Sequence, residues 1–341
     1  MKKSICVRIF CALLTLVALF GTVSCDSNGQ KEPATDSATA SDTLANETNE
    51  PAEDDSLRVI IASDVHHTTL QNWYGVTSKA RMQWWVNDIK AEHERSPIDL
   101  LIIAGDTSLD HLENRGTYTT GKLSTTKSFM DDYVSQLPED IPVFVLPGNH
   151  EQFSREQWKK MTGNDRFGTI AIKGHLFIML DNYNSKLEPN RTGDPDYTPT
   201  DVNYVKEQMA AHPECSKVWL VAHHFDPKLE TQEFKDLVKS EKRIKGLFSG
   251  HTHLCSVINL GADFGGKKLA QTGNYSYTWY TAIPDTVDLA EVRDSFWGFR
   301  ELNITSEAAV SNYIICETKG PVVNGVTIDL KRKSIHSVRF Y

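Results

Sequence analysis

The chain has 341 residues, of which 40% are hydrophobic and 24% charged, and its formal net charge is −9. This composition is ordinary for a globular protein that buries a large core. Residues 1–24 hold three basic residues and residues 25–56 hold nine acids and one lysine, which leaves −4 for residues 57–341. A mildly acidic domain without a Lys/Arg stripe argues against binding to extended nucleic acid, which depends on neutralised phosphates.

The amino terminus is a predicted export signal. Basic residues lead into the apolar run Ile9 to Val23, which ends at Ser24-Cys25. This resembles a bacterial lipoprotein signal peptide at residues 1–24, with Cys25 as the lipidated residue. The alternative is a transmembrane anchor, but the run is shorter than the roughly 20 apolar residues that span a bilayer. We therefore expect acyl chains on Cys25 to anchor the exported protein in the cell envelope, in the periplasm or at the outer membrane.

The segment from 25 to 56 is a predicted tether. It is rich in Ser, Thr, Ala, Asn, Glu and Asp and has no aromatic residue, so it cannot bury enough surface to offset chain entropy. Three cysteines remain in the folded part, Cys215, Cys255 and Cys316. An odd number argues against a disulfide framework, although one pair is allowed in an oxidising compartment.

From residue 57 onward, short apolar runs alternate with helical patterns. The runs predict buried strands at Leu57 to Ala62, Leu100 to Ala104, Pro142 to Leu146, Leu176 to Leu180, Val218 to Ala222 and Leu247 to Phe248. Apolar residues at helical spacing predict helices over Ser78 to His93 and Ser124 to Leu137. This alternation of strand and helix predicts an α/β fold.

The last part of the chain has a different pattern. Shorter and more polar strands are predicted at Val310 to Glu317, Val322 to Asp329 and Ser334 to Tyr341, and we expect them to form a second sheet packed on the first. The segment Asn184 to Asp201, rich in Pro, Asn and Asp, predicts a loop. This loop is expected either to wall a substrate pocket or to be a solvated excursion.

Five polar clusters follow the predicted strands. They are Asp64-Val65-His66, Gly105-Asp106, Gly148-Asn149-His150-Glu151, His223 and Gly250-His251-Thr252-His253. Ligands of open α/β sheets gather outside the carboxyl ends of strands, so these clusters are expected to converge. Any one of them is a weak signal, but their ordered coincidence is a strong one.

In order and residue type the clusters resemble the pattern D-x-H, G-D, G-N-H-[DE], H and G-H-x-H of the calcineurin-like metallophosphoesterases, over roughly residues 57 to 275. The resemblance implies a domain at 57–341 with a two-sheet β-sandwich flanked by helices. It also implies two divalent metal ions, with Mn, Fe, Zn and Ni all suited to these side chains. By the same resemblance, Asp64, His66 and His253 bind the first ion, Asn149, His223 and His251 bind the second, and Asp106 bridges both.

The resemblance implies hydrolysis of a phosphate ester by a hydroxide that bridges the two metals. His150 is expected to stabilise the transition state or to protonate the leaving oxygen, or otherwise only to orient a ligand. Glu151 is expected to lie behind the ligands. Between His223 and His224, the family motif selects His223 as the ligand.

Several other polar side chains are candidates for contact with substrate, namely His67, His224, Asn182 and Tyr275, with Asn274, Tyr183 and Tyr277 beside them. His67, like His111 and His175, is otherwise expected to lie on the polar surface without a role as a ligand. The function that the motifs favour is a phosphodiesterase or phosphomonoesterase acting on a small phosphate ester. The alternative is a non-catalytic envelope-binding lipoprotein on the same fold, with Trp73, Tyr74, Trp279 and Tyr280 as an exposed aromatic surface.

Overall fold

The structure, a computed structural model, describes residues 56–341 except 71, 114–123, 185, 190–192, 278–296 and 324–325. The described residues all belong to one unit, Glu53–Tyr341. The predicted signal peptide, Cys25 and all but the last residue of the predicted tether lie outside the described residues, as do Trp279 and Tyr280. No helix in the described part of the chain combines the length and apolar character needed to cross a bilayer.

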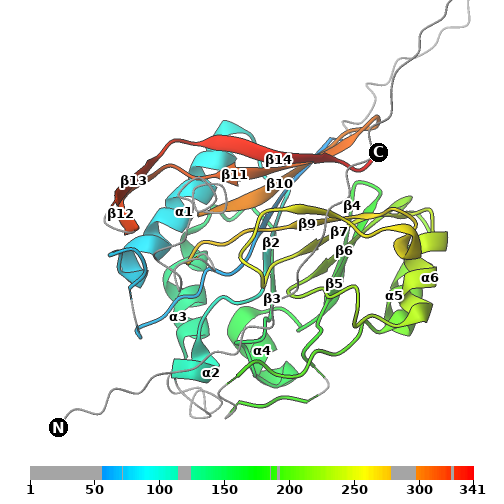
Figure 1. The fold of residues 1–341 in the computed structure, drawn as a ribbon, viewed down its shortest axis with the longest axis horizontal. Helices are drawn as coiled ribbons and strands as arrows, with labels where there is room; N and C mark the ends of the chain where they lie inside the picture. Colours follow the sequence, from blue (N-terminus) through cyan, green and yellow to red (C-terminus); the bar gives the residue numbers. More distant parts are fainter. Residues whose placement is uncertain are drawn as a thin grey trace, which may run out of the picture. The chain divides into compact units, whose positions relative to one another are not determined.

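The first sheet has the strand order β14-β11-β10-β1-β2-β3 (Figure 1). Its strands are β1 (Leu57–Ala62), β2 (Leu100–Ala104), β3 (Val143–Leu146), β10 (Gly298–Ile304), β11 (Ala309–Ile315) and β14 (Lys333–Arg339). The pairs β1–β2 and β2–β3 are parallel, and β10, β11 and β14 extend the sheet with antiparallel pairing. Every residue of β1 and β2 is buried, which explains their continuous apolar sequences.

The second sheet has the strand order β4-β5-β6-β7-β9-β8. Its strands are β4 (Gly168–Ile172), β5 (His175–Leu180), β6 (Lys217–Ala222), β7 (Ile244–Ser249), β8 (Val257–Asn259) and β9 (Lys268–Gln271). The four central strands run parallel, and β4 and β8 pair antiparallel at the edges.

Six α-helices connect the described strands, and side-chain caps begin five of them. The helices are α1 (Ser78–Arg95), α2 (Asp110–Glu113), α3 (Thr125–Asp132), α4 (Arg155–Thr162), α5 (Val202–Ala211) and α6 (Gln232–Ser240), with 3-10 turns η2 (Val134–Gln136) and η3 (Ala262–Phe264). The capping residues are Thr77, Ser124, Ser154, Asp201 and Thr231. Each accepts a hydrogen bond from a backbone N–H of the first turn that has no partner within the helix.

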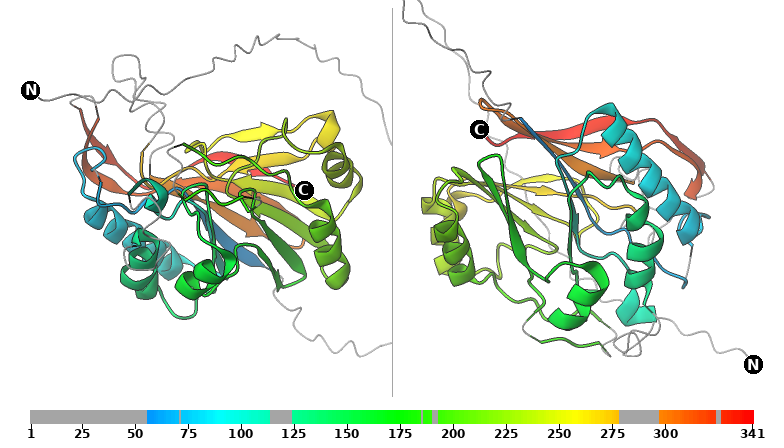
Figure 2. Two further views of the ribbon diagram at one scale, coloured as in Figure 1. Left: turned by 90° about the horizontal axis from the view of Figure 1, so that it is seen from below. Right: turned by 180° about the vertical axis from the view of Figure 1, so that it is seen from behind.

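Three apolar cores separate four layers. Trp85 of α1 packs with strand residues such as Ile60 on the outer face of the first sheet. Val59 and Trp219 belong to the core between the two sheets. Phe234 of α6 lies in the core on the outer face of the second sheet. The layers are therefore helix, sheet, sheet and helix (Figure 2), which confirms the predicted fold class.

The predicted assignment of strands to sheets is wrong. The carboxyl-terminal strands do not form a sheet of their own, because β10 pairs with β1 in a register that sets Val59 opposite Leu302. Each sheet instead contains part of the parallel strands. This division cannot be read from the strands themselves, since any buried apolar strand can pair on either side.

Two further predicted elements differ. The single strand predicted over Val322 to Asp329 is an antiparallel pair, β12 (Thr318–Val323) and β13 (Val326–Leu330). The helix predicted over Ser124 to Leu137 ends at Asp132 and continues as η2, because Tyr133 leaves helical geometry with φ −124° and ψ −53°. The predicted loop at 184–201 has no helix or strand among its described residues.

Candidate metal centre

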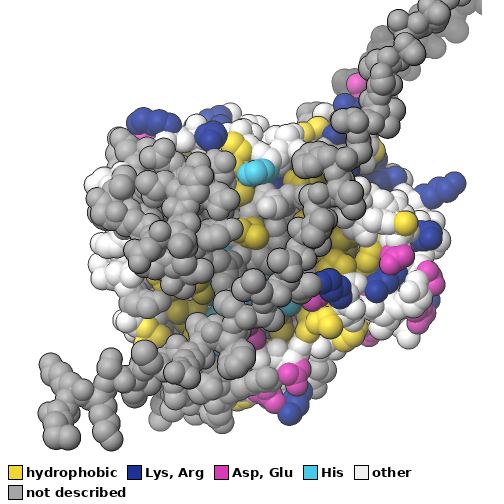
Figure 3. Space-filling model, viewed as in Figure 1, with side chains coloured by type: hydrophobic (Ala, Val, Ile, Leu, Met, Phe, Trp, Pro, Cys, Tyr) yellow, Lys and Arg dark blue, Asp and Glu magenta, His cyan; other side chains and the backbone are white. Residues whose placement is uncertain are grey.

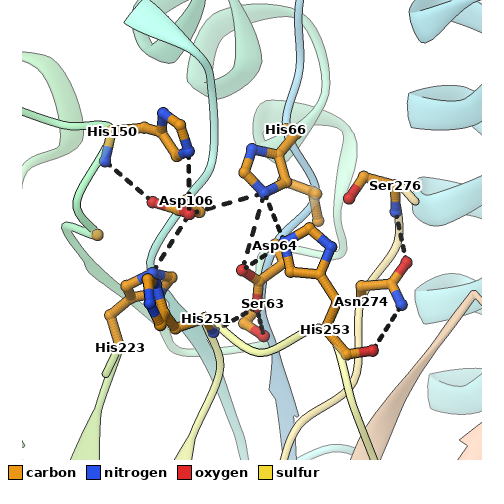
Figure 4. Close-up of polar contacts among 12 residues, drawn as sticks. Ser63, Asp64, His66, Asp106, His150, His223, His251, His253, Asn274 and Ser276 are labelled. Atoms are coloured by element: carbon orange, nitrogen blue, oxygen red, sulfur yellow. Dashed lines mark hydrogen bonds and ion pairs between the residues drawn. The ribbon is translucent and has the colours of Figure 1, made fainter. Parts of the chain in front are cut away.

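Five loops that follow parallel strands of both sheets meet at one place (Figure 4). They carry Asp64 and His66 after β1, Asp106 after β2, Asn149 and His150 after β3, His223 after β6, and His251 and His253 after β7. All seven predicted metal ligands thus come together at the carboxyl ends of the strands, where α/β folds form their sites.

Asp106 lies at the middle of this cluster. Its Oδ2 is 3.6 Å from Nε2 of His66 and 3.3 Å from Nε2 of His223. Its Oδ1 accepts a hydrogen bond from the backbone N–H of His150 at 3.1 Å. One carboxylate oxygen therefore faces imidazoles from both halves of the cluster, which is the position of a bridging ligand.

The first half of the cluster consists of Asp64, His66 and His253. Asp64 Oδ1 lies 3.8 Å from Nε2 of His66 and 3.4 Å from Nε2 of His253, and the two Nε2 atoms are 3.2 Å apart. Among the described residues, Asp64 Oδ1 is buried and has no hydrogen-bond partner. A buried carboxylate oxygen without a partner is costly, and a divalent cation among these atoms would satisfy it.

The second half consists of Asn149, His223 and His251. Oδ1 of Asn149 lies 2.9 Å from Nε2 of His223 and 3.0 Å from Nδ1 of His251. With Asp106, this half offers one carboxylate, one amide oxygen and two imidazoles. Such mixed oxygen and nitrogen donors suit Mn, Fe, Ni and Zn.

Electrostatics ties Asp106 to His223. Burial disfavours the charged form of both side chains. The attraction between the negative carboxylate and the positive imidazolium is stronger than this effect and favours the charged forms. The pKa of the Asp106 carboxyl is held well below its usual range, and the pKa of His223 is raised to about 10. Burial likewise opposes charge on Asp64, but His253 and His66 keep the pKa of its carboxyl low. The site therefore holds ionised carboxylates beside positive charge.

The backbone at the ligands is strained. Non-glycine residues with positive φ include five of the seven predicted ligands, namely Asp64 (52°), His66 (43°), Asp106 (51°), His251 (68°) and His253 (58°). Such conformations cost of order 1–3 kcal/mol each and persist only where the surrounding structure enforces them. Their concentration here marks the cluster as a functional site.

The glycines of the motifs allow the loops to approach each other closely. Gly105 has φ +85°, and a Cβ on it would meet the His223 ring at 2.5 Å from Nδ1. A Cβ on Gly250 would lie 2.5 Å from Oδ2 of Asp64. Both motifs therefore need glycine for space, and Gly105 needs it for its positive φ as well.

Hydrogen bonds behind the ligands fix their orientation. Nδ1 of His223 lies 2.9 Å from the carbonyl oxygen of Ala104, and Nδ1 of His253 lies 2.5 Å from that of Tyr277. Only a protonated Nδ1 can pair with a carbonyl, so both rings turn Nε2, the nitrogen that would bind a metal, into the cluster.

Glu151 lies behind the ligands, where it was expected. Its Oε2 accepts from the backbone N–H of Asp106 at 3.0 Å and of Gly148 at 2.7 Å. Its Oε1 accepts from Ser108 N at 2.9 Å and from Thr107 Oγ1 at 3.1 Å. One buried carboxylate thus joins the loop after β2 to the loop after β3.

His150 lies beside Asp106, with its Nε2 3.6 Å from Oδ2 of that carboxylate. Its Nδ1 is 2.9 Å from Nδ1 of His111. The expectation that His111, His67 and His175 lie on the polar surface is wrong, because all three are buried. Burying a histidine costs little free energy when a ring nitrogen has a hydrogen-bond partner. Each of these three rings has such a partner.

Three of the four candidates for substrate contact instead form hydrogen bonds within the protein. Both ring nitrogens of His67 are within 3.0 Å of serine hydroxyls, Ser78 and Ser128. Tyr275 is fully buried and its hydroxyl bonds to Asp88, so its side chain does not face the space where a substrate could bind. Asn182 is also buried, and its amide donates to the carbonyl of Thr198 at 3.0 Å within the loop.

His224 is the fourth candidate and lies next to a predicted ligand. Its ring stacks on His251 at 3.9 Å between centroids, and its Nδ1 is 2.6 Å from the hydroxyl of Tyr183. On the other side of the cluster, the half-buried Tyr277 ring is 4.4 Å from that of His253. Aromatic side chains thus flank both halves of the cluster.

Two contributors to the site were not recognised in the sequence. Asp194 accepts a hydrogen bond from Nδ2 of Asn149 at 2.7 Å, and His111 pairs with His150. Asp194 lies in the loop that was expected either to wall a pocket or to be solvated, and its contact supports the first interpretation. No spacing rule distinguishes it from the other acids of this loop.

Comparison with known proteins agrees with this geometry. The family model of the calcineurin-like phosphoesterases matches residues 57–255, whereas no curated protein matches the chain. Similar solved structures include GAP50, the anchor in the inner membrane complex of Plasmodium (13% identity, 82% of this chain and 89% of that chain, TM-score 0.46). They also include a Vps29 single mutant from Entamoeba histolytica (12% identity, 82% of this chain and 99% of that chain, TM-score 0.35). A third is the calcineurin-like phosphoesterase YfkN from Bacillus subtilis (11% identity, 82% of this chain and 90% of that chain, TM-score 0.38).

The matched region contains four of the five parallel-strand loops of the site in full and reaches past His253 in the fifth, so every predicted ligand lies within it. The match also spans more than half of the chain. The protein belongs to the calcineurin-like phosphoesterase family.

Proposed function

We propose that the protein is a metal-dependent hydrolase of small phosphate esters that uses a two-metal centre. The observation that carries the proposal is the position of Asp106, whose Oδ2 faces His66 of one half and His223 of the other at 3.6 and 3.3 Å. A shared carboxylate between two sets of nitrogen and oxygen donors is what a pair of divalent cations requires.

The positions of the residues assign each one to a role in the proposed centre. Asp64, His66 and His253 would hold the first cation and Asn149, His223 and His251 the second, with Asp106 shared between them. Bound cations would supply an acidified water as the nucleophile and neutralise charge on the phosphoryl oxygens. His150 directs Nε2 toward the same space and would donate a hydrogen bond to an oxygen of the phosphate ester.

A non-catalytic binding role on the same fold has less support. It would use an exposed aromatic surface, but Trp73 and Tyr74 are only 8% and 9% exposed. Trp73 instead covers Arg81 and stacks near Tyr277, beside the first half of the cluster. The complete set of seven predicted metal ligands also favours a catalytic role.

The setting of the enzyme is part of the proposal. We infer that acyl chains on Cys25 tether it in the bacterial cell envelope and that its substrate is a small ester, phosphodiester or phosphomonoester. On the face seen in Figure 3, Lys and Arg side chains lie among Asp and Glu around α5 and α6. Mixed charges of this kind favour a small substrate over an extended nucleic acid.

The test combines metal analysis with two chromogenic esters. The purified protein is stripped with a chelator, reloaded with Mn²⁺, Zn²⁺, Ni²⁺ or Fe²⁺, and assayed with p-nitrophenyl phosphate and bis-p-nitrophenyl phosphate. We expect two ions per chain by mass spectrometry and turnover that returns with metal. Asp106→Ala should lose both ions and all turnover, whereas His150→Gln should keep the ions and lose turnover.

Asp131→Ala is the matched control, because Asp131 is exposed on α3 and its carboxylate pairs with Lys127 at 2.6 Å, away from the cluster. It should leave metal content and turnover unchanged. Two bound ions without hydrolysis of either ester, with any of the four metals, would argue against the proposed function.

A further inference from the structure

His111 and His150 meet through like atoms. Their Nδ1 atoms are 2.9 Å apart, and the backbone N–H of His111 also donates to the carbonyl of His150 at 3.4 Å. His111 is 1% exposed on α2 and His150 is 9% exposed in the loop after β3. Two ring nitrogens at this distance share a single hydrogen, so one is the donor and the other the acceptor.

The position of that hydrogen decides which nitrogen of His150 faces the metal centre with a proton. If His111 donates, a neutral His150 carries its own hydrogen on Nε2. If His150 donates from Nδ1, a neutral His150 presents a bare lone pair at Nε2, and His111 must carry its hydrogen on its own Nε2.

The surroundings distinguish these arrangements. Nε2 of His150 lies 3.6 Å from Oδ2 of Asp106, so an N–H there faces an acceptor, whereas a lone pair would face a carboxylate. Nε2 of His111 is buried and has no hydrogen-bond partner among the described residues. A bare lone pair is tolerated there more easily than an N–H, because orphaned buried N–H groups are the rarer case. A doubly protonated His150 would leave the same orphaned N–H on His111.

We propose that His111 is a positioning residue that donates its Nδ1–H to Nδ1 of His150 and so fixes His150 as the tautomer with its proton on Nε2. In this form His150 faces the metal centre with an N–H throughout. Given the proposed function, the consequence is a permanent hydrogen-bond donor for an oxygen of the phosphate ester, so no proton has to be rearranged before each turnover.

The test is a direct reading of the tautomer by NMR. Protein labelled with ¹⁵N-histidine is studied metal-free and loaded with diamagnetic Zn²⁺, and the His150 signals are assigned by their loss in His150→Gln. Ring nitrogens with and without hydrogen differ strongly in chemical shift. We expect Nε2 of His150 to be protonated and Nδ1 to be bare. A proton on Nδ1 of His150 in the wild-type protein would overturn the proposal.

Two variants at His111 make the test sharper. His111→Asp can only accept, so it should move a hydrogen onto Nδ1 of His150. His111→Leu removes the bond and should lower kcat about 100-fold with metal content unchanged, the range found for loss of one positioned proton donor. His111→Asn, whose Nδ2 occupies the place of the His111 Nδ1, should restore the wild-type tautomer and most of kcat.

The NMR reading does not depend on turnover, so it separates the two proposals. A chain that hydrolyses no ester yet shows Nε2–H at His150 would contradict the proposed function and support the tautomer. Unchanged His150 shifts in both His111→Asp and His111→Leu would show that His111 does not set the tautomer.

Discussion

Asp194 accepts a hydrogen bond from Asn149, with 2.7 Å between Oδ1 of the carboxylate and Nδ2 of the amide. The bond fixes which way the amide points, because its nitrogen is turned to the loop before α5. Its oxygen is then turned to His223 and His251. A carboxylate from a loop whose described residues form no helix or strand thus orients a predicted metal ligand.

Asp194→Ala should weaken binding of the ion at the second half of the cluster by about 10- to 100-fold, the usual effect of removing a group that orients a ligand. Titration of the stripped protein with Zn²⁺ against a chelating indicator resolves the two affinities. Asp196→Ala, an exposed acid of the same loop, is the control and should leave both affinities unchanged. Equal affinities in Asp194→Ala and wild type would contradict the orienting role.

Glu151 supports the site by accepting backbone hydrogen bonds from two loops. In Glu151→Gln, an NH₂ group replaces one oxygen and faces N–H donors of either Asp106 and Gly148 or of Ser108. We expect a loss of up to about 3 kcal/mol in the free energy of unfolding, because at least one buried backbone N–H would then face another donor instead of an acceptor. Urea denaturation measures this change.

Glu156→Gln is the isosteric control, since Glu156 is exposed on α4. It should change the free energy of unfolding by less than about 0.5 kcal/mol, as surface substitutions usually do. A Glu151→Gln variant as stable as this control would mean that the backbone donors find other acceptors.

The sequence was sufficient to predict the ligand-bearing strands, because β1 and β2 are wholly buried and read as unbroken apolar runs. Each is followed by a motif, so convergence of the motifs followed from parallel pairing. The pairing itself could not be predicted. Whether β1 takes β10 as its second neighbour depends on contacts between residues more than 240 positions apart, such as Leu57 and Ile304.

Residues that act through a ligand were harder to predict than the ligands. His111 and His175 have the same residue type and both are buried, yet one pairs with His150 and the other with Trp219 in the core between the sheets. Nothing in their neighbouring sequence separates the two roles, since each is decided by a partner about 40 residues away. Such roles depend on tertiary structure alone.

Gly148 is required for space at the centre of the site. A Cβ there would overlap Oδ1 of Asp106 and lie 2.6 Å from its backbone nitrogen. Gly148→Ala should therefore displace the shared carboxylate, lower the metal content from two ions to none, and reduce stability by about 1–3 kcal/mol through overpacking. Gly193→Ala is the control, because a Cβ there would meet no atom of the described residues within 4 Å. Full metal content in Gly148→Ala would show that the loop can shift without losing the site.

Asp88 gives a pH dependence of stability that is separate from the metal centre. It lies on α1, accepts from the hydroxyl of Tyr275, and is mostly buried. Burial raises the pKa of its carboxyl to about 6. A carboxyl whose pKa is raised by folding binds its proton more tightly in the folded state. The contribution of Asp88 to stability is therefore greatest below about pH 4 and is lost as the pH rises through 6.

Asp88→Asn removes this titration. The free energy of unfolding of the variant should therefore increase relative to that of the wild type as the pH rises. The shift of about two pKa units corresponds to about 3 kcal/mol in all, of which about 1.4 kcal/mol lies between pH 5 and pH 8. Urea denaturation across this range gives the difference between variant and wild type at each pH. Asp131→Asn, at an exposed position on α3, should show a difference that does not vary with pH. A constant difference for Asp88→Asn as well would mean that the Tyr275 hydroxyl stabilises the ionised carboxylate enough to cancel the effect of burial.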